Sequence, residues 1–364
     1  MLMFHYKVVH IKESESFNRA VKTLTNKLEL FMSEAVIPLI TIFFKFDSAE
    51  EYHSKKSSIE KQILKANKDG FVLVFPVQSL IDEVLVGEFF YMDEGWDKQE
   101  ACLNNFVSYK KNKALTYFYI SQNISADEAF NDLDALFRDY ALSHTQVIRQ
   151  WNYIERILDE EEDGQNYQKF NNVRSEIYSD DFQFGYPSAT GIGQQCGGVL
   201  LAGFGLLDDQ LEVKSVRSAV QADAHQYSVQ VLVGKDRDEL RSPKFERGKI
   251  LIGSDKAMFF VSGTASIENQ QTVYENNPEK QLFKTIENIK ILTERAEEML
   301  KWEADMNCMQ LRCYVRPGCN VHGLEEVLFN NFQCMPVIVV ADICRNDLFV
   351  EIECIYKFYR SNGS

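Results

Sequence analysis

Short apolar runs of strand length alternate with amphipathic stretches of helix length along almost the whole chain, and this alternation restricts the fold most. Residues 36–46 read VIPLITIFFKF, a β-branched and aromatic run between stretches 14–30 and 50–66, which carry apolar residues at helical spacing. The same alternation resumes after residue 167. The sequence therefore predicts an α+β protein in which helices pack on mixed sheets.

The length of 364 residues is about twice that of a usual single domain, so we expect two domains, at 1–124 and 125–364. Hydrophobic residues make up 45% and charged residues 26%, the balance of a globular protein with ample core material. The longest apolar run, 36–44, is shorter than the roughly 20 residues of a membrane helix. Residues 1–16 lack the pattern of a signal peptide, and we expect a cytoplasmic protein that binds no membrane.

Charge and cysteine content exclude further classes. The chain has 39 Lys and Arg against 54 Asp and Glu, a net charge of −15 that repels a phosphate backbone, so we expect no nucleic-acid binding. Of its eight cysteines, six lie between residues 308 and 354, with neither a C-x-x-C nor an H-x-x-x-H spacing in the chain. We expect reduced, buried thiols, no metal and no cofactor.

Several elements can be placed from local patterns. Ser125 and Glu128 have capping-box spacing, and apolar residues at helical spacing predict a helix that runs, with a break near Ser143, to Leu158. A second helix begins at Asn277, with Pro278 at its first position. Further helices are predicted at 167–178 and 323–332, and strands at 5–12, 71–77, 84–92, 114–121, 197–205, 211–216, 227–234, 249–253, 258–267, 308–315, 335–342 and 348–356.

The glycine-rich segment 186–198 contains a G-x-G at Gly191 and Gly193. A dinucleotide-binding turn needs a strand before it, a helix after it and a third glycine, whereas a strand-like run follows here. We expect a loop whose backbone approaches a ligand or a neighbouring strand, and a simple tight turn is the alternative.

Glu351 and Glu353 lie two residues apart in an apolar strand, so both side chains face the same side. Two carboxylates on one buried face raise each other's pKa, and a carboxyl group with a raised pKa suits proton delivery to carbon. The alternative is the solvated face of an edge strand.

Four segments in order resemble one family: RQWNYI at 149–154, YQKFNNVR at 167–174, SATGIG at 188–193 and SPKFERG at 242–248. They are similar to the chorismatases, which release pyruvate from chorismate. The segment SGTAS at 262–266, the helix at 281–288 and VEIE at 350–353 resemble the larger YjgF/RidA superfamily. The resemblance covers roughly residues 145–357 and implies two RidA-like (chorismate mutase-like) halves, the first degenerate and the second holding the site.

The resemblance implies cleavage of the enolpyruvyl ether of chorismate without metal or cofactor, with Glu351 as the acid. Chorismate carries two carboxylates, which guanidinium groups match with paired hydrogen bonds. Arg247 is therefore our first expected substrate ligand, joined by Arg149, Arg174, Tyr153 and Ser266. Arg345 also lies beside the resembling segments. A structural role for Arg149 and Arg174, joining two elements from helices, is the alternative.

Cys344 and Gly263 bear on the product. Cys344 lies seven residues before Glu351, and we expect a turn at 345–347 between two antiparallel strands to separate them. In the chorismatases, a cysteine and a glycine at these positions accompany aromatisation to hydroxybenzoate, and alanines accompany hydrolysis to a diene. The resemblance therefore favours 3-hydroxybenzoate. Cys344 as a buried structural residue is the alternative.

One departure from the chorismatase pattern keeps other functions open. Chorismatases usually carry an aromatic stretch before S-P-x-F-x-R, but residues 230–235 read QVLVGK here. A catalytically inactive RidA-like small-molecule binding protein is therefore the main alternative, followed by an unrelated scaffold. Imine hydrolysis is disfavoured, because Pro336 stands where those relatives have an arginine. We expect a monomer or a small homo-oligomer.

Overall fold

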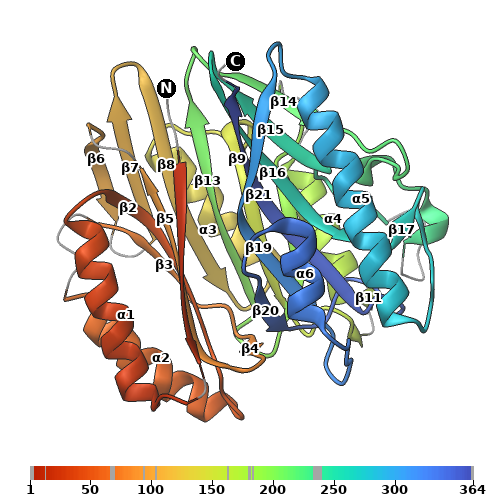
Figure 1. Cartoon of the computed structure of the whole chain (residues 1–364), viewed down its shortest axis with the longest axis horizontal. Coiled ribbons are helices and arrows are strands. Elements are labelled where there is room, and N and C mark those ends of the chain that lie inside the picture. Colours follow the sequence, from red (N-terminus) through yellow and green to blue (C-terminus); the bar gives the residue numbers. More distant parts are fainter. Residues whose placement is uncertain are drawn as a thin grey trace.

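The computed structural model describes residues 4–12, 14–65, 70–92, 95–102, 105–161, 164–178, 182, 184–232 and 240–361. Its strands form three large sheets, with a pair of helices on the outer face of each (Figure 1). Among the described residues, no helix is both long enough and apolar enough to cross a membrane.

One strand order occurs in all three sheets. The first sheet has the order β1 (Phe4–Lys12), β5 (Glu83–Met92), β2 (Val36–Phe44), β3 (Val72–Val74). The second has the order β12 (Ser188–Gln194), β9 (Val147–Glu155), β13 (Val199–Leu207), β8 (Ala114–Asn123), β7 (Phe106–Lys111), β6 (Asp97–Cys102). The third has the order β14 (Glu212–Val216), β15 (Gly248–Ile252), β16 (Lys256–Ala265), β21 (Val350–Arg360), β19 (Ala304–Val315), β20 (Val337–Val340), β4 (Ser79–Leu80).

The repeated part is a set of four strands with the same directions. We number the four strands of a set by their order along the chain. In each sheet the first strand pairs antiparallel with the fourth, the fourth pairs antiparallel with the second, and the second pairs parallel with the third. The sets are β1-β5-β2-β3, β8-β13-β9-β12 and β16-β21-β19-β20. We call them, with their helices, units 1, 2 and 3.

The three sheets separate an inner core from three outer cores. The helices are α1 (Phe17–Met32) and α2 (Ala49–Ile63) in unit 1, α3 (Ala126–Asp139) and α4 (Asn166–Ile177) in unit 2, and α5 (Pro278–Glu298) and α6 (Leu324–Phe332) in unit 3. Each outer core lies between one sheet and its helices. The inner core contains buried residues from all three sheets, which places the inner faces of the sheets against one another.

The two predicted helix starts are confirmed. The Ser125 hydroxyl accepts the Glu128 N–H at 3.2 Å, and α3 follows. The Asn277 side chain accepts the Lys280 N–H at 3.0 Å, with Pro278 as the first residue of α5. In both cases a side chain satisfies a backbone donor that has no partner within the helix.

The predicted helix from Ser143 to Leu158 is wrong. Residues 144–146 form a short 3-10 turn, and residues 147–155 form strand β9. This strand lies between β12 and β13 and is buried on both faces, so its apolar residues do not alternate. Their spacing resembled a helix for that reason, and Arg149 lies on a strand rather than on a helix.

Three other local predictions also change. Residues 188–194 form strand β12, not a loop, although a Cβ at Gly193 would meet Asp342 O at 2.9 Å, so the expected close backbone approach is present. The predicted strand 227–234 has a short 3-10 turn at 229–231, and positions 233–234 lie outside the described residues. The strands around Cys344 are not hydrogen-bonded neighbours, because β19 separates β20 from β21.

The α+β class, with helices packed on mixed sheets, is confirmed. The strand order occurs in three units, where the resemblance implied two RidA-like halves. Strand β8 pairs with β13 across residue 124, so the second sheet takes strands from both sides of the predicted boundary. The division into 1–124 and 125–364 stays a prediction.

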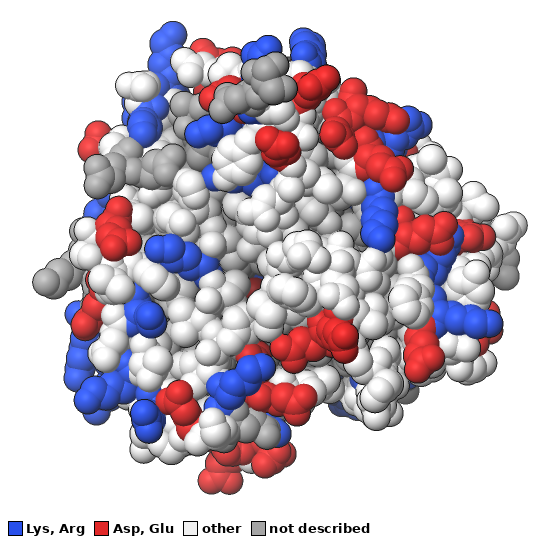
Figure 2. All heavy atoms as spheres, in the orientation of Figure 1, with Lys and Arg blue, Asp and Glu red and all other residues white. Residues whose placement is uncertain are grey.

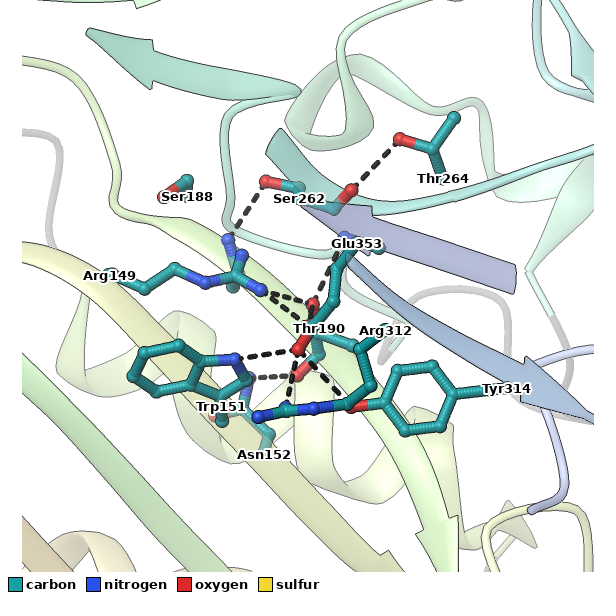
Figure 3. Close-up of polar contacts among 12 residues, drawn as sticks. Arg149, Trp151, Asn152, Ser188, Thr190, Ser262, Thr264, Arg312, Tyr314 and Glu353 are labelled. Carbon is teal, nitrogen blue, oxygen red and sulfur yellow. Dashed lines mark hydrogen bonds and ion pairs between the residues drawn. The ribbon is translucent and has the colours of Figure 1, made fainter. Parts of the chain in front are cut away.

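Two arginines join the three units through buried ion pairs, and Figure 3 shows both of their side chains beside Glu353. Arg149 of β9 pairs with Glu353 of β21 at 2.6 Å. Arg312 of β19 pairs with Glu353 at 2.5 Å and, through its other terminal nitrogen, with Glu88 of β5. All four side chains are at most 2% exposed, so none of these charges is screened by water.

Replacement of Arg312 by Met should lower the free energy of unfolding by about 3–5 kcal/mol, because Glu88 and part of Glu353 then remain buried without their cation. Urea unfolding followed by circular dichroism measures this. Arg295→Met is the matched control, since the exposed Arg295–Glu298 pair contributes only about 0.2–0.5 kcal/mol. An equal decrease in the free energy of unfolding in the two variants would contradict a central role for Arg312.

Candidate active site

A cavity lies at the junction of units 2 and 3. Strand β12 and the beginning of α4 form one side, and the end of β16 and the beginning of β21 form the other. Five of the predicted site residues line it: Glu351, Cys344, Arg247, Arg174 and Gly263.

Glu351 is the second residue of β21 and is 4% exposed. Burial and then the charge of Glu353 raise the pKa of Glu351 to about 8, although Arg149 and Arg247 act in the opposite direction. Glu351 therefore holds its proton at neutral pH. This is the property that proton donation to carbon requires.

The expectation that both carboxylates have raised pKa values is wrong for Glu353. Burial raises its pKa, but Arg312 and Arg149 outweigh burial, so the pKa of Glu353 lies below its ordinary value. The Trp151 indole N–H also donates to Glu353 at 3.0 Å, and the Thr190 hydroxyl donates to it as well. One strand thus carries a protonated and an ionised carboxyl group two residues apart.

Arg247 and Arg174 supply buried positive charge to the cavity. The Nε and Nη2 of Arg247 donate to Ala222 O at 3.2 and 2.9 Å, and Nη2 also donates to the Tyr227 hydroxyl. Its remaining nitrogen, Nη1, has no hydrogen bond to the part of the chain that the structure describes. Arg174 is held by Asn171 at 2.7 Å, and burial lowers its pKa.

Gly263 and Cys344 lie beside the acid. A Cβ at Gly263 would lie 2.0 Å from Oε1 of Glu351 and 3.1 Å from Cγ2 of Thr190, so only glycine leaves room for the carboxyl group in this position. Burial, followed by the charge of Glu351, raises the pKa of Cys344 to about 12. The thiol is therefore neutral and can donate or accept only weak hydrogen bonds.

Three predicted substrate residues do not line the cavity. Arg149 is engaged with Glu353 and with the Thr190 hydroxyl at 2.6 Å. The Tyr153 hydroxyl accepts from Arg312 at 3.2 Å in the inner core. The Ser266 hydroxyl donates to Val273 O at 2.8 Å.

Two tyrosines of the cavity were not predicted as site residues, whereas Arg345, which also lines it, lies beside the resembling segments. Tyr167, from the beginning of α4, packs over Gly191, where a Cβ would lie 3.2 Å from its ring. The guanidinium carbon of Arg345 lies 5.5 Å from the centre of the Tyr227 ring. Tyr167 is the first residue of the resembling segment YQKFNNVR, so the sequence did contain a signal for it. No local pattern distinguishes Tyr227.

The accessible volume of this cavity is about 60 Å³, room for a few water molecules. A ring-sized ligand must therefore displace part of the wall. Tyr227, Val231 and Leu232 form a part of that wall that lies outside the strands and α-helices. Across the described ranges, His, Cys, Asp and Glu side chains nowhere form a group of three or more suited to a metal ion.

Comparisons with known proteins agree on one family. Residues 94–204 match the family model described as "Chorismatase FkbO/Hyg5-like, N-terminal". A 3-hydroxybenzoate synthase of Streptomyces hygroscopicus is 29% identical over 227 residues, which cover 58% of this chain and 63% of that enzyme. The chain is similar to the chorismatases. The predicted resemblance is thereby confirmed, although the match spans less than two thirds of the synthase.

The fold agrees with this relationship. A crystal structure of a chorismatase superposes with a TM-score of 0.68 and 17% identity, covering 98% of this chain and 99% of that one. The chorismatase fold therefore extends over the N-terminal third as well, where the sequence resemblance was weakest.

The carboxyl group of Glu351 should titrate with a midpoint near pH 8, measured by carbon NMR of glutamate-labelled protein and assigned by its loss in Glu351→Gln. Arg247→Met should move the midpoint upward, because Arg247 lowers the pKa of Glu351. Arg295→Met, a distant exposed change, should leave it in place. A midpoint near the ordinary glutamate value of about 4.3 would refute the assignment.

Gly263→Ala should displace the Glu351 side chain, since the new methyl group would occupy the position of Oε1. The NMR midpoint should shift while the free energy of unfolding changes by less than it does in Arg312→Met. Gly318→Ala is a control for the loss of a glycine, because no atom lies within 4 Å of its Cβ position, although its φ of +76° adds local strain. An unchanged Glu351 midpoint in Gly263→Ala would mean that the side chain does not lie against Gly263.

Proposed function

We propose that the chain releases pyruvate from chorismate and forms 3-hydroxybenzoate, with Glu351 as the proton donor. The observation that carries this proposal is the protonated, buried Glu351 carboxyl group in a cavity that also holds Arg247, Arg174 and Arg345. The similarity to a 3-hydroxybenzoate synthase supports the same activity.

The first step is proton transfer from Glu351 to the methylene carbon of the enolpyruvyl group. It converts the enol ether into an oxocarbenium ion and leaves Glu351 ionised. Arg247 and Arg149 lower the pKa of Glu351 and thereby stabilise the anion that forms, while burial and Glu353 favour the protonated starting state. The balance of these charges places the pKa near neutral pH, where a general acid is most effective.

The second step is capture of the cation by the neighbouring ring hydroxyl. Its oxygen bonds to the oxocarbenium carbon, while its proton passes to the original ether oxygen and the bond between that oxygen and the carbon breaks. The bond between the attacking oxygen and the ring then breaks, so this oxygen leaves as the carbonyl oxygen of pyruvate and the ether oxygen stays on the ring as the phenol. Loss of a ring proton to ionised Glu351 restores both the aromatic ring and the acid. The atoms of chorismate are thus divided between 3-hydroxybenzoate and pyruvate without consuming water.

Water competes with the ring hydroxyl for the cation, so its exclusion decides the product. The small accessible volume of the cavity and the neutral Cys344 thiol favour intramolecular capture. Arg247, with its unpaired Nη1, and Arg345 bind the substrate carboxylates in this proposal.

The decisive experiment is incubation of the full chain with chorismate, followed by chromatography and a coupled assay for pyruvate. Equal amounts of 3-hydroxybenzoate and pyruvate are expected. Pyruvate with a dihydroxy-cyclohexadiene carboxylate would assign hydrolysis instead. Saturable binding without turnover would assign the inactive binding protein.

Glu351→Gln should reduce turnover by about 10²–10⁴, because glutamine keeps the shape of the side chain but cannot transfer the proton. Wild-type turnover should fall as the pH rises through about 8, where Glu351 loses its proton. Glu298→Gln, an exposed change far from the cavity, should keep both the rate and the pH profile. Near-normal turnover in Glu351→Gln would remove this residue from the mechanism.

A further inference from the structure

Two of the buried ion pairs, Arg149–Glu353 and Arg312–Glu88, lie at equivalent positions in two junctions between units. Arg149 of unit 2 reaches Glu353 on the last strand of unit 3, and Arg312 of unit 3 reaches Glu88 on the last strand of unit 1. Both arginines lie on the second strand of their unit, so the junction of units 3 and 1 is built like the junction that holds the candidate active site.

Counting from these pairs identifies equivalent positions. Glu351 lies two residues before Glu353, and Val86 lies two residues before Glu88. Their partners on the neighbouring strand are Ala265 and His10, respectively. The second junction therefore has the apolar Val86 at the position that Glu351 takes in the first. It has His10 at the position of Ala265, a residue of the wall of the first cavity.

The third strands of the units correspond in the same way. Ser188 pairs with Arg149, and Val337 pairs with Arg312, so Ala189 corresponds to Ile338. Ala189 lines the candidate active site, whereas Ile338 and His10 line a second cavity, of about 580 Å³. The beginning of α6 also lines this cavity, as the beginning of α4 lines the first.

The second cavity is lined by a carboxylate–imidazole pair, in which the imidazole is partly exposed. Nδ1 of His10 lies 2.8 Å from Oε1 of Glu83, whose side chain is 7% exposed. Nε2 of His10 is buried and has no partner among the described residues. The pair therefore places the Glu83 carboxylate at the wall of the cavity.

The charge of this cavity is opposite to that of the first. Its lining has four carboxylates, those of Asp82, Glu83, Glu325 and Glu326, against the single ammonium of Lys12, and it contains no arginine. Phe329 and Met335 line it with 41% and 43% of their surfaces exposed. Figure 2 shows the largely uncharged area around β19 and α6, with acidic side chains along its lower side.

We propose that this cavity is a second binding site, selective for a small organic amine with an apolar or aromatic body. The ammonium group of the ligand donates to the carboxylates of this lining, which balance its charge. The apolar body packs against Ile338 and Phe329. A dicarboxylate such as chorismate is repelled, so the two junctions separate ligands by charge.

Isothermal titration of the full chain with benzylamine, with benzoate as the anionic counterpart, tests the proposal. Benzylamine should bind, and Glu83→Gln should weaken its binding roughly tenfold or more, because a charge-assisted contact is lost. Glu351→Gln should leave benzylamine binding unchanged, which separates this cavity from the first. Pyruvate release, where measured, should be unaffected by Glu83→Gln.

Phe329→Ala changes an exposed side chain and serves as a second variant in case Glu83→Gln does not fold. It should weaken benzylamine binding through lost packing, while Phe283→Ala, exposed on α5 outside the cavity, should not. No binding of benzylamine, equal binding of benzoate, or a benzylamine affinity unchanged in both cavity variants would overturn the proposal.

Discussion

Two buried arginines determine how the three sheets meet. Arg312 spans the inner core between Glu88 and Glu353, and Arg149 approaches Glu353 from the second sheet. A charge removed from water is tolerated only when an opposite charge and further hydrogen bonds satisfy it. Trp151, Thr190, Tyr153 and Tyr314 supply those bonds, so apolar packing alone does not fix the relative positions of the sheets.

The same cluster sets the chemistry of the cavity beside it. Glu353 stays ionised because two guanidinium groups surround it, and its negative charge helps Glu351 to stay protonated. Two carboxyl groups on one strand are thereby given opposite protonation states by their surroundings. The groups that hold the molecule together also place an acid near neutral pH.

Sequence patterns predicted what depends on neighbours along the chain. Caps at Ser125 and Asn277 and the position of Glu351 in an apolar strand needed only local spacing. Strand β9 was misassigned because burial on both faces removes alternation. Arg312 was overlooked because its partners lie 41 and 224 residues away, and Tyr227 because its place depends on the packing of Arg247 and Arg345.

Strand β4 adds a consequence for biosynthesis. It comes from the N-terminal part of the chain, yet it pairs with β20 at the edge of the third sheet. Glu88 likewise waits for Arg312, made 224 residues later. At about 5–20 residues per second of translation, this delay is roughly ten to forty-five seconds. During that time β4 lacks its partner strand and Glu88 lacks its cation, so the N-terminal unit can dock fully only after the third sheet has been made.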